Sequence, residues 1–150
     1  MLEVNRLGEQ VGAEMFGVDV RDLADEDFAI IYQTWLDCNV ICVRDQSLDA
    51  VEEFFAYSRR FGRLHEHPSK STRHSEYPEL TVLGTDKFNT DGSLNEAVYA
   101  RGGENWHTDG AYDEVSFKAT QLYALAIPST GGDTLFSSMY AAYGALPERL

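Results

Sequence analysis

Apolar residues at helical spacing predict a helix over residues 23–38. The segment opens with acidic residues, which suit the positive end of a helix dipole. The apolar stripe of this helix consists of Phe28, Ile31, Trp35 and Cys38. Residues 39–46, NVICVRDQ, follow as a short segment with an apolar centre, so we expect a strand that is buried on both faces.

A second apolar stripe predicts another helix over residues 47–62. Ser47 is its candidate N-cap, because a short hydroxyl side chain can accept from the free N–H groups of the first turn. Gly62 is its candidate C-terminal stop, because glycine ends helices without steric cost. The core positions of this helix are Val51, Phe54, Phe55 and Phe61.

The remaining segments favour strands joined by turns. Residues 4–20 mix strand-forming residues with glycines, which indicates short strands with bends. Residues 86–104 are rich in Gly, Asn and Asp and predict a long loop, which in compact domains is often functional. Further strands are predicted at 79–85, 116–128 and 133–138, a turn at 129–132 and a short helix at 139–146.

Composition and charge narrow the class of protein. A chain of 150 residues that is 43% hydrophobic is long enough for one globular domain with its own core. No apolar run reaches the roughly 18 residues that a membrane span needs, and no secretory signal is visible. The net charge of −13 disfavours nucleic acids and anionic membranes as partners. Cys38 and Cys42 lack the spacing of a redox or zinc motif and are interpreted as buried apolar residues of a cytoplasmic protein.

The candidate chemistry lies in residues 105–112, NWHTDGAY. Histidine occurs only four times in the chain, and His107 stands two residues before Asp109. In a strand, residues two apart point to the same face, so we expect the imidazole and the carboxylate to project together. They would supply two ligands of a 2-His-1-carboxylate facial triad, which holds Fe(II) and leaves adjacent positions open. Gly110 would end the strand and let a substrate approach the backbone. Taken alone, the motif favours a surface histidine beside a solvated aspartate, and only its context favours a metal site.

Several stretches occur in an order that resembles the N-terminal half of the taurine dioxygenase family of iron- and 2-oxoglutarate-dependent oxygenases. They are GAEMFGVDV, VRDQ, RRFGRLHEHP, NWHTDGAY and GGDTLFSSMYAAYGAL, and together they span nearly the whole chain. The resemblance implies an α+β fold in a single domain over residues 1–150. That fold is a double-stranded β-helix, or jelly roll, flanked by helices and here incomplete at the C-terminus.

The resemblance also implies roles for individual residues. His107 and Asp109 correspond to iron ligands of the family. Thr134, 27 residues after His107, is similar to the family threonine whose hydroxyl helps to hold the distal carboxylate of 2-oxoglutarate. Without the resemblance, Thr134 would be interpreted as an ordinary strand residue. His67 resembles the histidine that contacts substrate in the taurine enzymes.

Two positions depart from the taurine pattern. Lys70 stands where those enzymes have a tyrosine, and Gly103 stands where they have an asparagine. We therefore expect a substrate other than taurine. Lys70 could pair with a sulfonate, sulfate or carboxylate, although a solvated loop lysine is the interpretation that we favour.

The resulting prediction is an Fe(II)- and 2-oxoglutarate-dependent dioxygenase. It would hydroxylate a small organic substrate with O₂ and release succinate and CO₂.

The family's second iron-binding histidine and its 2-oxoglutarate-binding arginine lie in the C-terminal half, and no histidine follows His107. We therefore expect the chain to be the front part of a longer protein and to be weakly active or inactive by itself. Exposed apolar edges would allow it to form a homo-oligomer. The upstream histidines that could complete a triad are His65, His67 and His74. Two alternatives stay open: a non-catalytic β-rich binding module derived from such an enzyme, and a zinc-dependent hydrolase.

Overall fold

The computed structural model describes residues 1–66, 73–74, 76–81, 105–127 and 129–147. The chain divides into two compact units. The first comprises Met1–Phe61 and Tyr123–Leu150, and the second comprises Gly62–Leu122. His67 and Lys70, together with the predicted loop at 86–104, lie outside the described residues.

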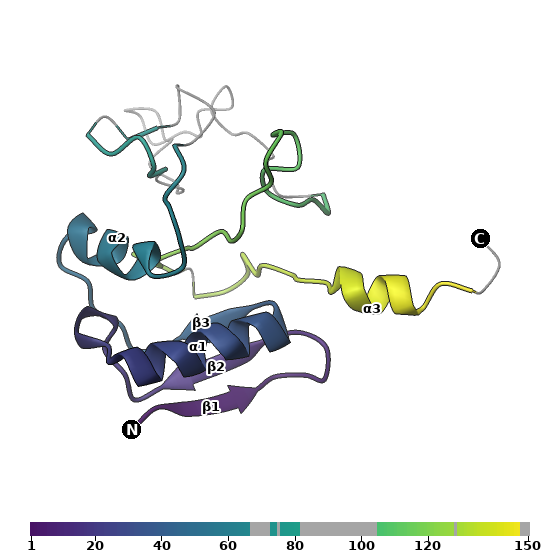
Figure 1. The fold of residues 1–150 in the computed structure, drawn as a ribbon, viewed down its shortest axis with the longest axis horizontal. Helices are drawn as coiled ribbons and strands as arrows, with labels where there is room; N and C mark the ends of the chain where they lie inside the picture. Colours follow the sequence, from purple (N-terminus) through teal and green to yellow (C-terminus); the bar gives the residue numbers. More distant parts are fainter. Residues whose placement is uncertain (67–72, 75, 82–104, 128, 148–150) are drawn as a thin grey trace. The chain divides into compact units, whose positions relative to one another are not determined.

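The first unit contains a small mixed sheet with the strand order β1-β2-β3 (Figure 1). Strand β1 (Glu3–Arg6) pairs antiparallel with β2 (Ala13–Phe16), and β2 pairs parallel with β3 (Ile41–Val43). The turn between β1 and β2 closes with a hydrogen bond of 2.9 Å from the Leu7 N–H to the Gly12 carbonyl oxygen. The short strands with bends that were expected over residues 4–20 are therefore confirmed.

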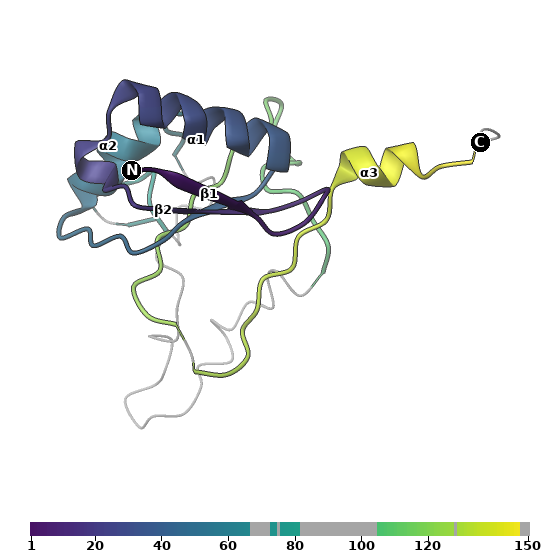
Figure 2. The ribbon, with the colours of Figure 1, turned by 90° about the horizontal axis from the view of Figure 1, so that it is seen from below.

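Helix α1 (Asp25–Cys38) lies along one face of this sheet, as Figures 1 and 2 show from two directions. Its predicted apolar stripe is confirmed, since Ile31 is fully buried and Cys38 is only 3% exposed. The helix ends at Cys38 and is capped by Asn39, which has a φ of 62° and donates its backbone N–H to the Trp35 carbonyl oxygen at 2.8 Å. The chain then returns at once as β3, beside β2.

The core of the first unit is centred on Met15, Ile31 and Phe61. Aromatic rings surround Phe61 at centroid distances between 5.1 and 5.9 Å, and all four pairs are tilted or edge-to-face. Such arrangements are favourable for aromatic quadrupoles beyond the burial of area. The rings belong to Phe28, Tyr32, Trp35 and Tyr57.

Helix α2 (Val51–Arg59) confirms the second predicted helix but corrects both of its ends. Ser47 is not the N-cap, because the helix begins four residues later with Ala50 in that position. The carboxylate of Glu53 instead accepts the backbone N–H groups of Asp49 at 2.8 Å and Ala50 at 3.3 Å. A carboxylate in the first turn satisfies free N–H groups as a hydroxyl would. The helix also ends at Arg59, before Gly62 is reached.

The prediction that β3 is buried on both faces is wrong. All three of its residues are half-buried, and β3 is an edge strand of the described sheet. An edge strand has a backbone partner on one side only, so its side chains lose less contact with solvent than those of a central strand. Just after it, Arg44 pairs with Glu14 across the neighbouring strand.

The strands that were predicted after residue 115 do not form in the described part of the chain. Residues 116–127 and 133–138 have no strand pairing, and several of their apolar side chains are exposed. A strand needs a partner to satisfy its backbone hydrogen bonds, and no described segment supplies one. At 79–85 only residues 79–81 are described, and these are not in a strand. The jelly roll therefore stays a prediction.

Helix α3 (Met139–Gly144) confirms the predicted short helix at 139–146. Ser138 is its N-cap and accepts the Ala141 N–H at 3.2 Å through its hydroxyl oxygen. Positive φ angles of 75° at Gly131 and 77° at Gly132 agree with the turn predicted at 129–132. Among the described residues, no helix combines the length and the apolar character that crossing a membrane requires.

Tyr57 should make the stability of the fold depend on alkaline pH. Burial raises the pKa of its phenol to about 12, whereas a phenol in the unfolded chain ionises near pH 10. The unfolded state therefore loses its proton first, and stability that is complete below about pH 10 falls as the pH rises to about 12. The loss should be on the order of 2 kcal/mol, measured by urea unfolding at several pH values.

Tyr57→Phe should remove this component of the pH dependence. Tyr143→Phe, at a side chain that is 78% exposed, is the matched control and should leave it unchanged. An identical alkaline loss in the wild type and in Tyr57→Phe would show that another group is responsible.

Candidate metal centre

His107 and Asp109 lie side by side in the second unit. The distance between His107 Nε2 and Asp109 Oδ1 is 3.3 Å, and both side chains are about half exposed. The strand that was expected to bring them together is absent. The backbone instead turns after Thr108, with hydrogen bonds from the Ala111 N–H to the Thr108 carbonyl oxygen at 3.4 Å and from the Asp113 N–H to the Gly110 carbonyl oxygen at 3.1 Å. The predicted proximity thus arises from a turn and not from a pleated strand.

The backbone carbonyl of Asn105 selects the tautomer of His107. Its oxygen lies 2.8 Å from His107 Nδ1. A carbonyl oxygen can only accept, so Nδ1 donates this hydrogen bond, and in the neutral form of the ring the lone pair lies on Nε2, the nitrogen beside Asp109. Metal-bound histidines generally donate their second ring N–H to such a carbonyl or carboxylate, which orients the ring. The imidazole is therefore prepared to bind a cation through Nε2.

The second carboxylate oxygen of Asp109 has a different partner. Thr120 Oγ1 lies 2.8 Å from Asp109 Oδ2, and the hydroxyl donates because an ionised carboxylate only accepts. Sequence patterns could not identify Thr120, which stands eleven residues beyond Asp109 in a predicted strand with no motif of its own. One oxygen of the carboxylate is thus tied to the protein, while the other faces the imidazole.

Gly110 allows the turn that follows the candidate ligands. Its φ is 68°, a conformation that L side chains rarely adopt, and a Cβ at this position would lie 2.7 Å from Cγ of Phe117. The Phe117 ring also stacks against the His65 ring, with 5.0 Å between centroids. The space beside Gly110 is therefore filled by Phe117, and contact between substrate and the Gly110 backbone stays a prediction.

The geometry of the pair fits two neighbouring positions on one metal ion. Ligand atoms at metal distances of about 2.1 Å and at right angles lie about 3.0 Å apart, close to the 3.3 Å between Nε2 and Oδ1. An imidazole nitrogen and a carboxylate oxygen suit a divalent first-row metal such as Fe(II). Among the described residues, no cluster of three or more His, Cys, Asp or Glu side chains completes a site. His65 and His74 are thus not brought to this pair as a third ligand.

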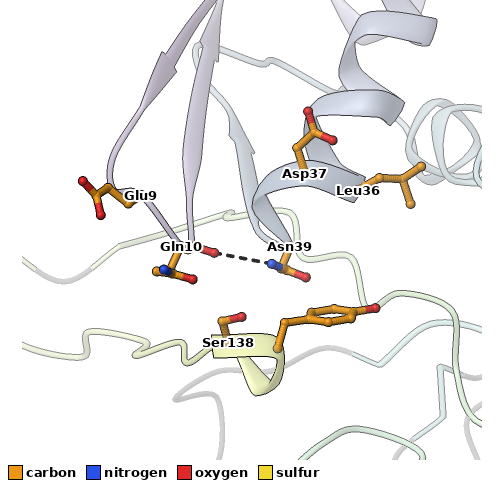
Figure 3. A pocket seen from close by; sticks show the side chains of 7 residues that line it. Glu9, Gln10, Leu36, Asp37, Asn39 and Ser138 are labelled. Atoms are coloured by element: carbon orange, nitrogen blue, oxygen red, sulfur yellow. Dashed lines mark hydrogen bonds between the residues drawn. The ribbon is translucent and has the colours of Figure 1, made fainter. Parts of the chain in front are cut away.

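Thr134 belongs to the first unit, where it is exposed and precedes α3. Its predicted contact with 2-oxoglutarate therefore stays a prediction. The first unit also has an open, polar hollow of about 250 Å³, shown in Figure 3. In it, the Asn39 side-chain amide approaches the Gln10 carbonyl oxygen at 3.5 Å. None of the predicted site residues lines this hollow, which is formed by Glu9, Gln10, Leu36, Asp37, Asn39, Ser138 and Tyr140.

Comparisons with known proteins place the chain in a family. The (S)-phenoxypropionate/alpha-ketoglutarate-dioxygenase of Sphingobium herbicidovorans is 31% identical, over 99% of this chain and 49% of its own length. The alkylsulfatase of Acinetobacter baylyi is 29% identical, over 99% of this chain and 43% of its own. A crystal structure of a taurine dioxygenase from Burkholderia xenovorans shares 30% identity with a TM-score of 0.46, over 51% of this chain and 28% of that one.

The chain thus spans about half of the length of these curated relatives or less. The sequence profile of one family covers residues 3–150, which is almost all of the chain. The order of motifs that pointed to this family is confirmed by that match. The chain belongs to the taurine catabolism dioxygenase TauD, TfdA family.

Proposed function

We propose that this chain carries part of the metal centre of an Fe(II)- and 2-oxoglutarate-dependent dioxygenase. The observation that supports this proposal most directly is the His107–Asp109 pair, with 3.3 Å between Nε2 and Oδ1. Family membership supplies the reaction class, because named relatives are alpha-ketoglutarate-dependent dioxygenases. The pair supplies two of the protein ligands that a facial triad needs.

The proposed cofactor is Fe(II) with 2-oxoglutarate as cosubstrate. Bound iron would supply the activation of O₂, coupled to oxidative decarboxylation of 2-oxoglutarate to succinate and CO₂. The chain's own groups bind and orient the metal. His107 offers Nε2, the Asn105 carbonyl holds its tautomer, and Asp109 offers Oδ1 together with one negative charge. Thr134 is proposed to hold the distal carboxylate of 2-oxoglutarate through its hydroxyl.

The proposed substrate is a small organic anion that is hydroxylated in the reaction. Relatives are named for acting on phenoxypropionate, on 2,4-dichlorophenoxyacetate and on alkyl sulfates. These compounds share one anionic group attached to an apolar body. His67 and Lys70 are the proposed substrate contacts, with Lys70 able to pair with a sulfonate, sulfate or carboxylate. Gly110 is the third proposed contact, through its backbone.

Anaerobic equilibrium dialysis with ferrous ion tests this proposal. One Fe(II) should bind per chain, with an affinity that rises when 2-oxoglutarate is present, because the cosubstrate would add its own donor atoms. Since the described residues contribute only two ligands, we expect Fe(II) to bind weakly. In a separate assay in air, we expect slow succinate release with phenoxypropionate, an alkyl sulfate or an alkyl sulfonate as substrate.

Three outcomes separate the proposal from its rivals. Failure to bind Fe(II), with or without 2-oxoglutarate, would support the non-catalytic binding module. Hydrolysis that depends on zinc and not on 2-oxoglutarate would support the hydrolase. Fast, substrate-dependent succinate release by this chain alone would confirm the reaction class and contradict the expected weak activity.

A further inference from the structure

We propose that Thr120 is a positioning residue for the metal centre, which sets the orientation of the Asp109 carboxylate. This inference rests on the proposed function. The two oxygens of this carboxylate are engaged in different ways. Oδ2 accepts the Thr120 hydroxyl at 2.8 Å, whereas Oδ1 lies 3.3 Å from His107 Nε2. The hydroxyl therefore defines which oxygen faces the metal together with the imidazole.

An exposed aspartate needs such a partner to hold one orientation. The Asp109 side chain is 48% exposed, and rotation about its terminal bond has broad, shallow minima. The distance of 2.8 Å between Thr120 Oγ1 and Asp109 Oδ2 is typical of an O–H···O hydrogen bond, and such a bond is stronger when its acceptor is an ionised carboxylate. The Thr120 hydroxyl thus restricts the rotation of the Asp109 carboxylate before a metal ion binds. Without this hydrogen bond, the rotation would be restricted only on metal binding.

The fold brings Thr120 to Asp109 through the turn between them. Gly110 reverses the chain with its φ of 68°, and the Phe117 ring packs onto Gly110 and onto His65. This packing anchors the chain three residues before Thr120. Threonine is branched at Cβ and has few allowed side-chain rotamers, so its backbone position largely determines where the hydroxyl points.

The consequence for metal binding is a carboxylate that binds through one oxygen. With Oδ2 held by Thr120, Oδ1 alone is directed to the position beside His107 Nε2. A carboxylate that bound through both oxygens would occupy a further coordination position. The 2-His-1-carboxylate arrangement depends on open positions for other ligands. Thr120 therefore protects an open coordination position while it strengthens metal binding.

Cobalt(II) is the probe for this inference, because its visible absorption reports the coordination geometry and its binding does not require turnover. Thr120→Val removes the hydroxyl and keeps the shape of the side chain. It should weaken Co(II) binding about tenfold, as is typical when the partner of a ligand is removed, and should change the absorption spectrum. Thr120→Ser keeps a hydroxyl and should bind within about threefold of the wild type. The matched control is Thr130→Val, at an exposed threonine of the bend before Gly131, which should bind as the wild type does.

The outcomes distinguish this inference from the proposed function. If Thr120→Val binds Co(II) with wild-type affinity and spectrum while Asp109→Ala does not bind, the positioning role is wrong and the metal centre stands. If Asp109→Ala binds as the wild type does, both are wrong. Far-UV circular dichroism checks that each variant folds. Should Thr120→Val fail to fold, the Co(II) affinities of Thr120→Ala and Thr120→Ser are compared instead. Equal Co(II) affinities in these two variants would overturn the positioning role.

Discussion

Replacing Asp109 or His107 by alanine is expected to abolish detectable ferrous ion binding to this chain. Each substitution removes one of the two ligand atoms that lie 3.3 Å apart in the candidate metal centre. Loss of a partner that only orients a ligand typically costs 10–100-fold in affinity, so loss of the ligand itself should exceed about 100-fold. Anaerobic titration calorimetry or equilibrium dialysis measures the effect directly, without any need for turnover.

His74→Ala is the matched control for His107→Ala. His74 belongs to the same unit, where its ring stacks on Tyr77 at 5.3 Å and its Nδ1 accepts the Glu76 backbone N–H at 3.2 Å. We therefore expect His74→Ala to keep ferrous ion affinity. An equal loss in both histidine variants, or no loss in either, would contradict the assignment of His107 as the ligand.

The largest expected loss of stability is that of Ile31→Ala, at about 3 kcal/mol in the free energy of unfolding. Ile31 is fully buried between α1 and the sheet, in the cluster with Met15 and Phe61. Truncation to alanine removes three methyl or methylene carbons and leaves a cavity that close-packed neighbours fill only in part. Urea unfolding, followed by tryptophan fluorescence to which Trp35 in the same core contributes, measures the change.

Ile30→Ala is a control of identical chemistry at the adjacent residue. The Ile30 side chain is 48% exposed, so the same truncation should cost less than about 1 kcal/mol. Equal losses at the two positions would mean that the helix does not present its predicted face to the sheet.

Local patterns predicted the helices of the first unit well. The stripe of Phe28, Ile31 and Trp35 identified α1 because residues that face one core must recur with the period of the helix. The same reasoning located α2 and α3, but it placed the start of α2 at Ser47. That error arose because capping depends on which side chain actually reaches the free N–H groups, and here Glu53 does so from inside the helix.

Strand predictions succeeded or failed according to whether a partner was present. Residues 3–16 pair with each other across a short turn, so strand-forming residues and glycines were sufficient signals there. Residues 116–127 were also predicted to form a strand but have no strand partner among the described residues. A strand forms only where another strand pairs with its backbone, and no local pattern identifies that partner.

For the metal centre, the sequence by itself determined the candidate ligands and the family. His107 and Asp109 are two residues apart, a spacing that indicated a shared face, and the ordered motifs around them match the family profile. Only the tertiary structure decided their surroundings: the Asn105 carbonyl at Nδ1, the Thr120 hydroxyl at Oδ2 and the Phe117 ring over Gly110. The physical reason is that periodicity and spacing report which residues lie near one another along the chain. The orientation of a carboxylate or an imidazole depends on donors and acceptors that folding brings in from other turns of the backbone.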